Sequence, residues 1–368
     1  MEILIVGDVH LGAGHSIGVE SPGKLNSRLE DKIKLFTWIL AKCKEYKVKR
    51  LIFTGDIFHD VKPDYKLVEI WLTYLVELEN SGIDVHVVYG NHDIMRIGDQ
   101  YYSALDLADI FNFKHVHMHK KISSVELDDV NLCFAPFRDK RSFKIDSNEK
   151  ALEILDSKIN ELIIENKPNL LIGHLTIDGS LYLGDEITDQ YNELRCPLSM
   201  FGKFEKVWMG HIHKPQEMSP TVSHVGSLDI SDYSEIKHNK ICVFYDTISK
   251  KEIKIEVPTR PFRNLVISVP ENFDSELFIK EFLIKENKID PLIDSILKIE
   301  INHHSSISKK TILELLTEYE IHNLAYFVER KISKETTIVN SVVSDNHILV
   351  PENSSKEFIE KNAKYDLQ

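Results

Sequence analysis

Cysteine is scarce in this chain. Its 368 residues include four cysteines, which are scattered and form no Cys-x-x-Cys pair. This spacing favours a reducing compartment over a disulfide framework. We therefore expect a cytoplasmic protein.

Long hydrophobic runs and a secretion signal are also missing. No apolar stretch approaches the roughly 18 residues needed to cross a bilayer. The opening residues, Met1–Val6, lack a basic segment and continue directly into Gly7 and Asp8, which is not a signal-peptide pattern. We expect no partnership with a membrane.

Basic side chains are fewer than acidic ones. The chain has 58 acidic and 45 basic side chains and a net charge of -13, which argues against nonspecific attraction of nucleic acid to the whole surface. Two possibilities stay open: a local basic groove, and a site in which carboxylates hold metal ions. One basic cluster, at 138–144 beside Phe137 and Phe143, fits either a nucleic-acid groove or a solvated loop.

The remaining composition is that of a globular protein. Hydrophobic residues make up 42% and charged residues 28% of the chain, and the length suggests about two domains of roughly 150 residues.

In the first 250 residues, short apolar runs alternate with amphipathic stretches, which predicts βαβ units and an α/β sandwich. The predicted strands are 3–6, 51–53, 85–89, 170–172, 207–209 and 241–245. Helices are predicted around 33–43, over 65–80 with a stop at Ser81-Gly82, and over 151–166.

Two prolines mark a boundary at Val257–Pro261, because proline restricts the backbone and breaks regular elements. Beyond it, strands are predicted at 264–269 and 296–301, and helices at 276–286 and 309–320. We expect a main domain over 1–258, a small α+β domain over 262–332, and a polar tail over 333–368.

Five short motifs follow predicted strands directly. They are Gly7-Asp8-Val9-His10, Gly55-Asp56, Gly90-Asn91-His92-Asp93, Gly173-His174 and Gly210-His211-Ile212-His213. Ligands of α/β sheets bind at the carboxyl ends of the strands, so these loops should meet at one edge. Glycine beside each polar residue lets the backbone turn sharply or approach a ligand closely.

The motifs supply seven donor side chains. The donors are Asp8, His10, Asp56, Asn91, His174, His211 and His213. One ion takes three or four protein ligands, so seven donors imply two ions with a shared bridge. Mixed nitrogen and oxygen ligands favour manganese, iron or zinc over magnesium or calcium. Two ions about 4 Å apart can clamp a phosphate and activate a water, so hydrolysis of a phosphoester is expected.

A single Gly-Asp or Gly-His after a strand occurs by chance in many proteins, and a lone histidine there is more often packed than a ligand. Five such motifs in this order are far more specific. Their order and spacing resemble the calcineurin-like metallophosphoesterase superfamily over residues 1 to about 250. The resemblance implies two β-sheets flanked by helices, with the metals at one edge.

Roles at the site follow from the same resemblance. The first ion would be held by Asp8, His10 and His213 and the second by Asn91, His174 and His211, with Asp56 bridging them. His92 would contact the scissile phosphate, stabilise its developing charge and protonate the leaving oxygen.

A narrower resemblance is to the SbcD-type recombination nucleases. It is carried by Gly7–Gly12, by Gly55–His59, by Val225–Leu228 and by the segment 232–240. It implies that His59 assists exonuclease action, and that the region after about residue 260 is a capping domain that binds DNA.

The activity and partners that this resemblance implies are specific. The implied activity is that of a manganese-dependent nuclease, which acts 3′ to 5′ on duplex DNA and as an endonuclease on single strands or hairpins. The implied partners are an SbcC-type ATPase and a second copy of the nuclease, which forms a homodimer. The apolar segments 67–78 and 101–111 could supply the dimer face or could simply cover the sheet.

Two other functions remain open at this point. One is a small-molecule phosphodiesterase or protein phosphatase of the same superfamily. The other is a non-catalytic scaffold, although all of the expected ligands are present.

Overall fold

The computed structural model describes residues 1–331 apart from 20–23, 98–99, 183–184, 187–192, 272, 290–291, 304–307 and 319–323. The polar tail predicted at 333–368 lies outside the described residues. Within them, no helix has both the length and the apolar character needed to cross a membrane.

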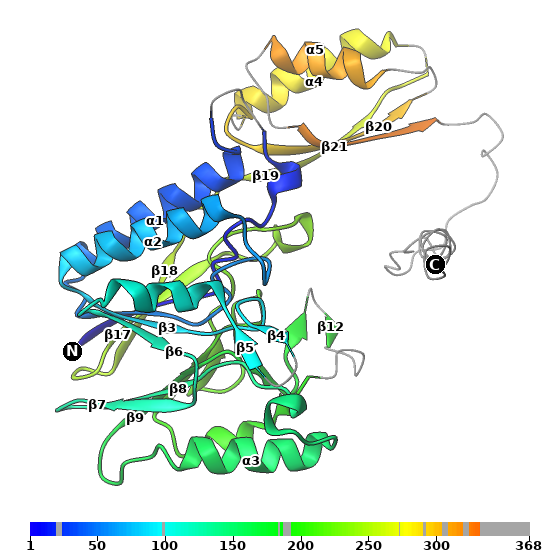
Figure 1. The fold of residues 1–368 in the computed structure, drawn as a ribbon. Helices are drawn as coiled ribbons and strands as arrows, with labels where there is room; N and C mark the ends of the chain where they lie inside the picture. The colour runs from blue at the N-terminus through cyan, green and yellow to red at the C-terminus, as the bar shows by residue number, and fades with distance from the viewer. Residues whose placement is uncertain are drawn as a thin grey trace, which may run out of the picture.

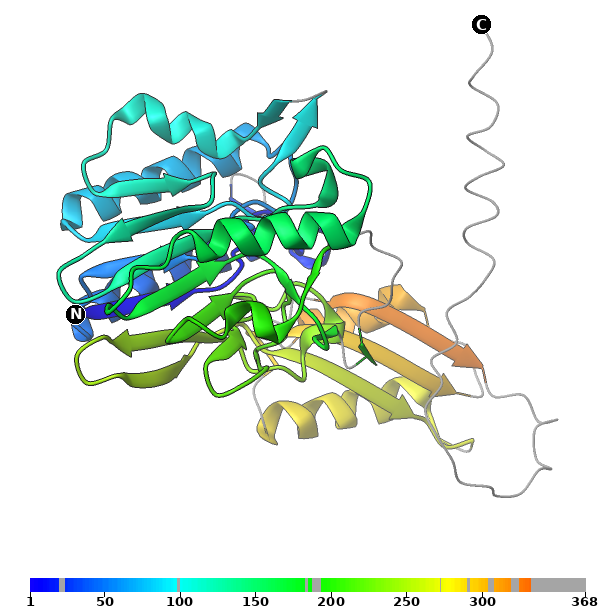
Figure 2. The same ribbon diagram turned by 90° about the horizontal axis from the view of Figure 1, so that it is seen from below.

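The main body has four layers in the order helices, sheet, sheet, helix (Figures 1 and 2). The first sheet contains, in spatial order, β18 (Lys251–Glu256), β17 (Ile241–Asp246), β1 (Glu2–Val6), β2 (Arg50–Phe53), β3 (Asp84–Val88) and β6 (Val116–His119). The second contains β15 (Gln216–Glu217), β16 (Val222–His224), β14 (Lys206–Met209), β9 (Asn169–Gly173), β8 (Asn131–Ala135) and β7 (Ser123–Glu126). The α/β sandwich and its predicted strands are confirmed.

Strand β1 shows why two sheets stack. Its side chains alternate between the two faces. Ile3 and Ile5 enter the cluster between the sheets, whereas Leu4 and Val6 enter the cluster beneath the helices. All four are fully buried. At about 1.5–3 kcal/mol for each buried aliphatic side chain, both faces of the sheet stabilise the sandwich.

Two long helices, α1 (Ser27–Glu45) and α2 (Tyr65–Ser81), cover the outer face of the first sheet (Figure 1). Phe36 of α1 stacks on Tyr74 of α2, with ring centroids 4.2 Å apart. Helix α2 ends where predicted, because Gly82 takes a left-handed conformation with φ 70° and its N–H bonds the Glu79 carbonyl.

Helix α3 (Asn148–Asn160) covers the outer face of the second sheet and is shorter than the predicted 151–166 at its carboxyl end. Two buried asparagines of neighbouring strands bind the backbone that would have continued the helix. Asn131 Nδ2 donates to the Leu162 carbonyl at 2.8 Å, and Asn169 Oδ1 accepts from Ile164 N–H at 3.0 Å. These side-chain bonds replace the helical ones.

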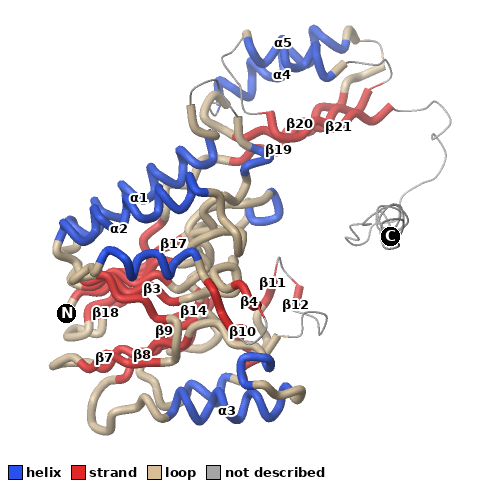
Figure 3. The backbone as a smooth tube through the Cα atoms, in the orientation of Figure 1, coloured by secondary structure: helices blue, strands red, loops and turns tan. Residues whose placement is uncertain are grey.

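Short elements connect the layers (Figure 3). The described 3₁₀ helices are η1 (His15–Ile17), η2 (Ala104–Phe111), η3 (Lys140–Phe143), η5 (Leu198–Phe201) and η6 (Tyr233–Glu235). Small strand pairs are formed by β4 (Met95–Ile97) with β5 (Gln100–Tyr102), β10 (Thr176–Ile177) with β13 (Arg195–Cys196), and β11 (Leu181–Tyr182) with β12 (Asp185–Glu186).

The C-terminal unit has its own parallel sheet and its own apolar cluster. Its elements are β19 (Phe262–Ser268), α4 (Ser275–Ile289), β20 (Ile296–His303), α5 (Lys309–Thr317) and β21 (Leu324–Lys331). The predicted strands and helices of this region are present, and β21 was not predicted. Leu265 and Ile299 of the strands pack in one cluster with Leu283 and Ile312 of the helices.

Polar contacts join the C-terminal unit to the main body. The Arg260 guanidinium donates two hydrogen bonds to the Asp31 carboxylate, at 2.8 and 2.7 Å. Tyr233 Oη donates to the Ile296 carbonyl at 3.1 Å. The Arg28 guanidinium lies over the Phe262 ring, 5.3 Å from its centroid.

Candidate metal centre

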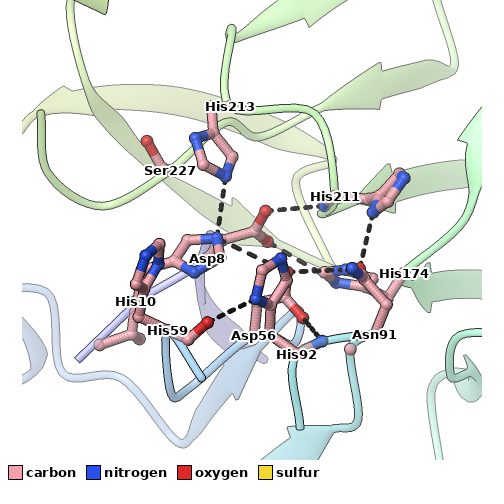
Figure 4. A network of polar contacts seen from close by, with 12 residues as sticks. Asp8, His10, Asp56, His59, Asn91, His92, His174, His211, His213 and Ser227 are labelled. Carbon is pink, nitrogen blue, oxygen red and sulfur yellow. Dashed lines mark hydrogen bonds and ion pairs between the residues drawn. The ribbon is translucent and has the colours of Figure 1, made fainter. Parts of the chain in front are cut away.

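Five loops meet where parallel strands from both sheets end. In the first sheet β1 pairs with β2 and β2 with β3, all parallel, and in the second sheet β9 pairs with β14 in parallel. Their carboxyl ends lie at one edge of the sandwich, and the predicted donors project from the loops that follow (Figure 4).

One group of donors consists of Asp8, His10 and His213, whose ligand atoms lie within 4.8 Å of one another. The Nε2 atoms of His10 and His213 are 2.8 Å apart. The Nδ1 atom of His213 faces the Glu235 carboxylate at 2.7 Å, so it carries the proton. The Nε2 lone pair of His213 therefore points at His10.

A second group consists of Asp56, His174 and His211, and Asn91 joins it. Asn91 Oδ1 lies 2.9 Å from His174 Nε2 and 2.9 Å from His211 Nδ1. The predicted assignment of ligands to two groups is thus matched by two clusters of side chains. Their role as ligands remains a prediction.

Asp56 lies between the two groups. Its Oδ2 atom is 3.5 Å from His10 Nε2 and 3.3 Å from His174 Nε2. Its other oxygen, Oδ1, accepts the backbone N–H of His92 at 2.8 Å. One carboxylate oxygen therefore faces both donor groups while the other is held by the backbone, as a bridging ligand requires.

The hydrogen bonds of the second group make it suited to a cation. His174 Nδ1 lies 3.0 Å from the Thr54 carbonyl, and His211 Nε2 lies 2.9 Å from the Glu193 carboxylate. Because those oxygens only accept, they take the ring protons of His174 Nδ1 and His211 Nε2, and the opposite ring nitrogens face the Asn91 amide oxygen. Against the effect of burial, the carboxylates of Asp56 and Asp8 raise the pKa of His174, so a proton on its Nε2 atom occupies this position. A divalent cation can replace that proton among the ring nitrogens, the amide oxygen and the carboxylate, so the residues present fit a divalent metal.

Burial and mutual charge shift the pKa values of the group. Burial lowers the pKa of His10 well below its usual value, so its imidazole is neutral. Burial raises the pKa of Asp8. Burial would also raise the pKa of Asp56, but the neighbouring His174 holds it below its usual range. The same pairing, with Asp8, raises the pKa of His174 to about 9 against the effect of burial.

The backbone is strained at this edge. His10, Asp56 and His211 all adopt left-handed conformations, with φ of 46°, 47° and 79°. Non-glycine residues seldom adopt this region, and such strain concentrates at functional sites. At two of the turns glycine leaves room for an aspartate: a Cβ on Gly90 would lie 2.0 Å from Asp56 Oδ1, and one on Gly210 would lie 2.3 Å from Asp8 Oδ1.

The two predicted catalytic histidines lie beside the metal-ligand candidates (Figure 4). His92 Nδ1 donates to the His59 backbone carbonyl, which leaves Nε2 as the atom that can meet a substrate. Its ring lies 5.0 Å from the His10 ring, and the exposed His59 ring stacks on it at 5.7 Å. Burial lowers the pKa of His59, which favours its neutral form.

Three acidic residues at the site were missed by sequence reasoning. Asp93, the last residue of the Gly-Asn-His-Asp motif, accepts N–H groups from Ile57, Phe58 and Gly90 and so ties two ligand loops together. Its place in a motif could have signalled this role. Glu193 and Glu235 bind His211 and His213. Glu235 lies in the segment 232–240 that carries the narrower resemblance, whereas no motif in the sequence marks Glu193.

His119 of strand β6 and Arg138 of the basic cluster have structural roles away from the metal-ligand candidates. His119 is buried and hydrogen-bonded to His86, with its Nε2 2.9 Å from His86 Nδ1, whereas His117 is exposed on the same strand. In the basic cluster, Arg138 donates to the carbonyls of Phe137 and Lys120 and so supports the loop, whereas Arg141 and Lys144 are exposed. A nucleic-acid groove and a solvated loop both stay open for this cluster.

Comparison with known proteins decides the family. The profile of the calcineurin-like phosphoesterases matches residues 1–215, a segment that includes all seven predicted ligands. The chain belongs to this family. By membership it is a metal-dependent phosphoesterase, and the family uses two divalent metals.

Named relatives align over most of the chain. The SbcD component of the nuclease SbcCD from Staphylococcus saprophyticus is 24% identical over 325 residues, which cover 84% of this chain and 80% of the relative. The DNA double-strand break repair protein Mre11 of Thermoplasma acidophilum is 25% identical over 333 residues, covering 86% and 81%. Among solved structures, a dimetal phosphatase from Danio rerio has a TM-score of 0.41 at 13% identity, covering 70% of this chain and 98% of that one.

Proposed function

We propose that this chain is a two-metal DNA nuclease, acting as a 3′ to 5′ exonuclease on duplex ends and as an endonuclease on single strands or hairpins. The observation that carries the chemistry is the position of Asp56 Oδ2 between two convergent donor groups. DNA as substrate is supported by the names of the relatives, which align far beyond the phosphoesterase region.

The metals that the site fits would supply Lewis-acid activation of a phosphodiester and of the attacking water. The mixed donor set favours manganese, iron or zinc, and the resemblance to the SbcD-type nucleases favours manganese among them. The chain's own residues do the rest. Buried Asp8 and Asp56 hold negative charge at the strand ends, and backbone N–H groups of His211 and His92 fix their orientation at 2.8 Å each.

His92 is the residue proposed to act on the substrate. Its backbone N–H is anchored on Asp56, and its ring proton at Nδ1 is anchored on the His59 carbonyl. The Nε2 atom is thereby free to contact a phosphate oxygen or to give a proton to the leaving oxygen when the ring is protonated. His59, exposed and stacked on the same ring, is the side chain that would meet a DNA end.

The proposed partners are DNA, an SbcC-type ATPase and a second copy of this chain, in a complex for repair or recombination. Support for the homodimer comes from apolar side chains on η2, where Leu107, Ile110 and Phe111 are 40%, 71% and 49% exposed. On the same helix Leu105 and Ala108 are buried in the cluster beneath α1 and α2. Helix η2 thus has an apolar outer face in addition to the face that covers the sheet.

The test is cleavage of an end-labelled linear duplex by the purified chain with manganese, magnesium or EDTA. Manganese-dependent shortening is expected. The control is His92→Ala, which should keep its metal and lose about 10²–10⁴-fold in rate. Near-normal cutting by His92→Ala would overturn the assignment of the catalytic histidine.

A chromogenic phosphodiester assayed on the same sample separates the remaining outcomes. Hydrolysis of that compound without any DNA cutting, even with the ATPase partner added, would point to a small-molecule phosphodiesterase or a protein phosphatase. Absence of bound metal after incubation with manganese would point to a scaffold without catalysis.

A further inference from the structure

The two histidines of the Gly-His-x-His motif face the candidate metal centre with different ring atoms. His211 presents Nδ1 to Asn91 and the second donor group, whereas His213 presents Nε2 to His10 and the first. In each ring the opposite nitrogen contacts a carboxylate, at 2.9 Å from Glu193 and at 2.7 Å from Glu235. Each histidine therefore has its own carboxylate partner at the ring nitrogen that faces away from the donor groups.

The two carboxylates differ in what else they support. Glu235 is buried and also binds the buried ammonium of Lys240 at 2.7 Å, so removing it would leave an unpaired buried charge. The side chain of Glu193 is 22% exposed, and its additional partner is the neutral hydroxyl of Thr176, at 2.8 Å. Glu193 can thus be replaced without leaving a charge in the core.

The fold holds Glu193 close to a ligand loop. Thr176 opens β10, two residues after His174, and it pairs with Arg195 of β13. Glu193 comes two residues before Arg195. One oxygen, Oε2, then accepts both the Thr176 hydroxyl and the His211 ring proton. The threonine fixes the carboxylate, and the carboxylate fixes the imidazole.

We propose that Glu193 is a positioning residue, which acts through His211 to hold the ring with its Nδ1 lone pair toward the second donor group. The proposal rests on the predicted role of His211 as a ligand. A carboxylate bound to the outer nitrogen of a ligand histidine fixes its tautomer and orientation and increases its basicity, and removing such a partner typically lowers metal affinity by 10- to 100-fold.

The test compares Glu193→Ala with Glu193→Gln in the full chain, because the glutamine oxygen can still accept the ring proton. Manganese binding is measured by calorimetric titration. We expect Glu193→Ala to bind one ion as the wild type does and the other 10- to 100-fold more weakly. Glu193→Gln should recover most of that affinity. The matched control is Glu217→Ala, which removes an exposed glutamate bound to Lys254.

A second measurement requires no metal. The ring protons are observed in NMR spectra of protein with ¹⁵N-labelled histidine, and the His211 signal is the one that His211→Gln lacks. In the wild type and in Glu193→Gln, the Nε2–H of His211 should resonate downfield. It should vanish in Glu193→Ala as the proton exchanges with water. Persistence of that resonance in Glu193→Ala would overturn the proposal.

The two measurements keep this proposal separate from the proposed nuclease. A wild type that binds no metal would refute the two-metal function while the ring-proton experiment still decides the role of Glu193. Equal weakening of both ions in Glu193→Ala, or failure of Glu193→Gln to recover affinity, would count against positioning through His211.

Discussion

At the scale of single residues, the two oxygens of Asp56 have separable roles. One is held by the His92 backbone and the other faces both donor groups. Asparagine could keep the backbone contact, but it has no negative charge with which to bridge two cations. We predict that Asp56→Asn weakens manganese binding by more than 100-fold.

Metal content after dialysis against manganese, measured by mass spectrometry, checks this prediction. Asp60→Asn is the matched control, since Asp60 is an exposed aspartate in the same loop. Two ions retained by Asp56→Asn would show that Asp56 is not the bridge.

His59 permits a second prediction at this scale. Its side chain is exposed, and His92 is anchored on its backbone carbonyl rather than on its ring. His59→Ala should therefore leave His92 in place and reduce exonuclease cutting about tenfold or more, with a smaller effect on endonuclease cutting. Rates on an end-labelled duplex and on a closed single-stranded circle measure the two activities. Equal losses would remove the specific role of His59.

Residues in motifs at strand ends were predictable because parallel strands of a sheet end at one edge. Their glycines marked the turns, and Gly90 and Gly210 do leave room for the two aspartates. Glu193 was not predictable, because it lies in a polar stretch with several acidic residues and no motif. Glu193 reaches His211 only because β10 pairs with β13, and that pairing is a property of the folded chain.

At the scale of elements, helix ends show what local sequence decides. Helix α2 ends at a glycine, as its sequence indicates, whereas α3 ends early because Asn131 and Asn169 bind the backbone that follows. Asn131 lies 31 residues before Leu162, on strand β8, whereas Asn169 lies five residues after Ile164, at the start of β9. Local pattern therefore predicts an end that the backbone itself makes, and misses one that tertiary contacts impose.

The outer face of η2 gives a prediction about assembly. If it forms the homodimer contact, a buried carboxylate there would oppose association. We predict that Ile110→Asp converts a dimer into a monomer of 42.5 kDa, as measured by sedimentation equilibrium. Ile248→Asp is the matched control, because Ile248 is 78% exposed on a different surface turn. An unchanged mass for Ile110→Asp would place the dimer contact elsewhere.

The contact between β3, β6 and β8 makes stability depend on pH. His86 and His119 share a hydrogen bond, and both rings stack on Phe134. Burial, with nearby histidines, lowers the pKa of His119 to about 3 and also lowers that of His86. Below the unfolded pKa of 6.5 the unfolded chain gains protons that the folded chain does not, so stability falls as pH falls toward 3.

The expected loss is about 1.4 kcal/mol per pH unit for each such histidine. Urea unfolding at pH 7, 6 and 5 should show a shallower decline for His119→Gln than for the wild type. Parallel declines would mean that His119 takes up protons equally in the folded and unfolded states.

At the scale of the whole molecule, Arg260 joins the linker to helix α1 through Asp31. A small phosphodiester needs the metal centre alone, whereas a DNA duplex is large enough to reach the C-terminal unit as well. We predict that Arg260→Gln leaves hydrolysis of a chromogenic phosphodiester unchanged and slows DNA cutting several-fold. Arg330→Gln, which breaks an ion pair with Glu300 inside that unit, is the control. If Arg260→Gln slowed the hydrolysis of the chromogenic phosphodiester as much as the cutting of DNA, the separate role of the C-terminal unit in DNA cutting would be contradicted.

The C-terminal unit also marks a limit of prediction at this scale. Two strands and two helices were predicted from their apolar pattern, but β21 was not. Several side chains of β21 are only partly buried, and Tyr326 and Arg330 are exposed. The segment 324–328 is apolar, but a short apolar run does not by itself distinguish a strand from a helical segment. The pairing of β21 with β20 shows that it is a strand.

Each donor group draws side chains from both sheets. Asp8 and His10 follow a strand of the first sheet and His213 a strand of the second. An ion bound by them is a cross-link between the two halves of the sandwich. Free ion at one hundred times its dissociation constant adds about 2.7 kcal/mol to the free energy of unfolding. Chelation of the ion would then weaken the contact between the two sheets as well as stop turnover. Amide hydrogen exchange would become faster at the carboxyl ends of β1 and β14 together.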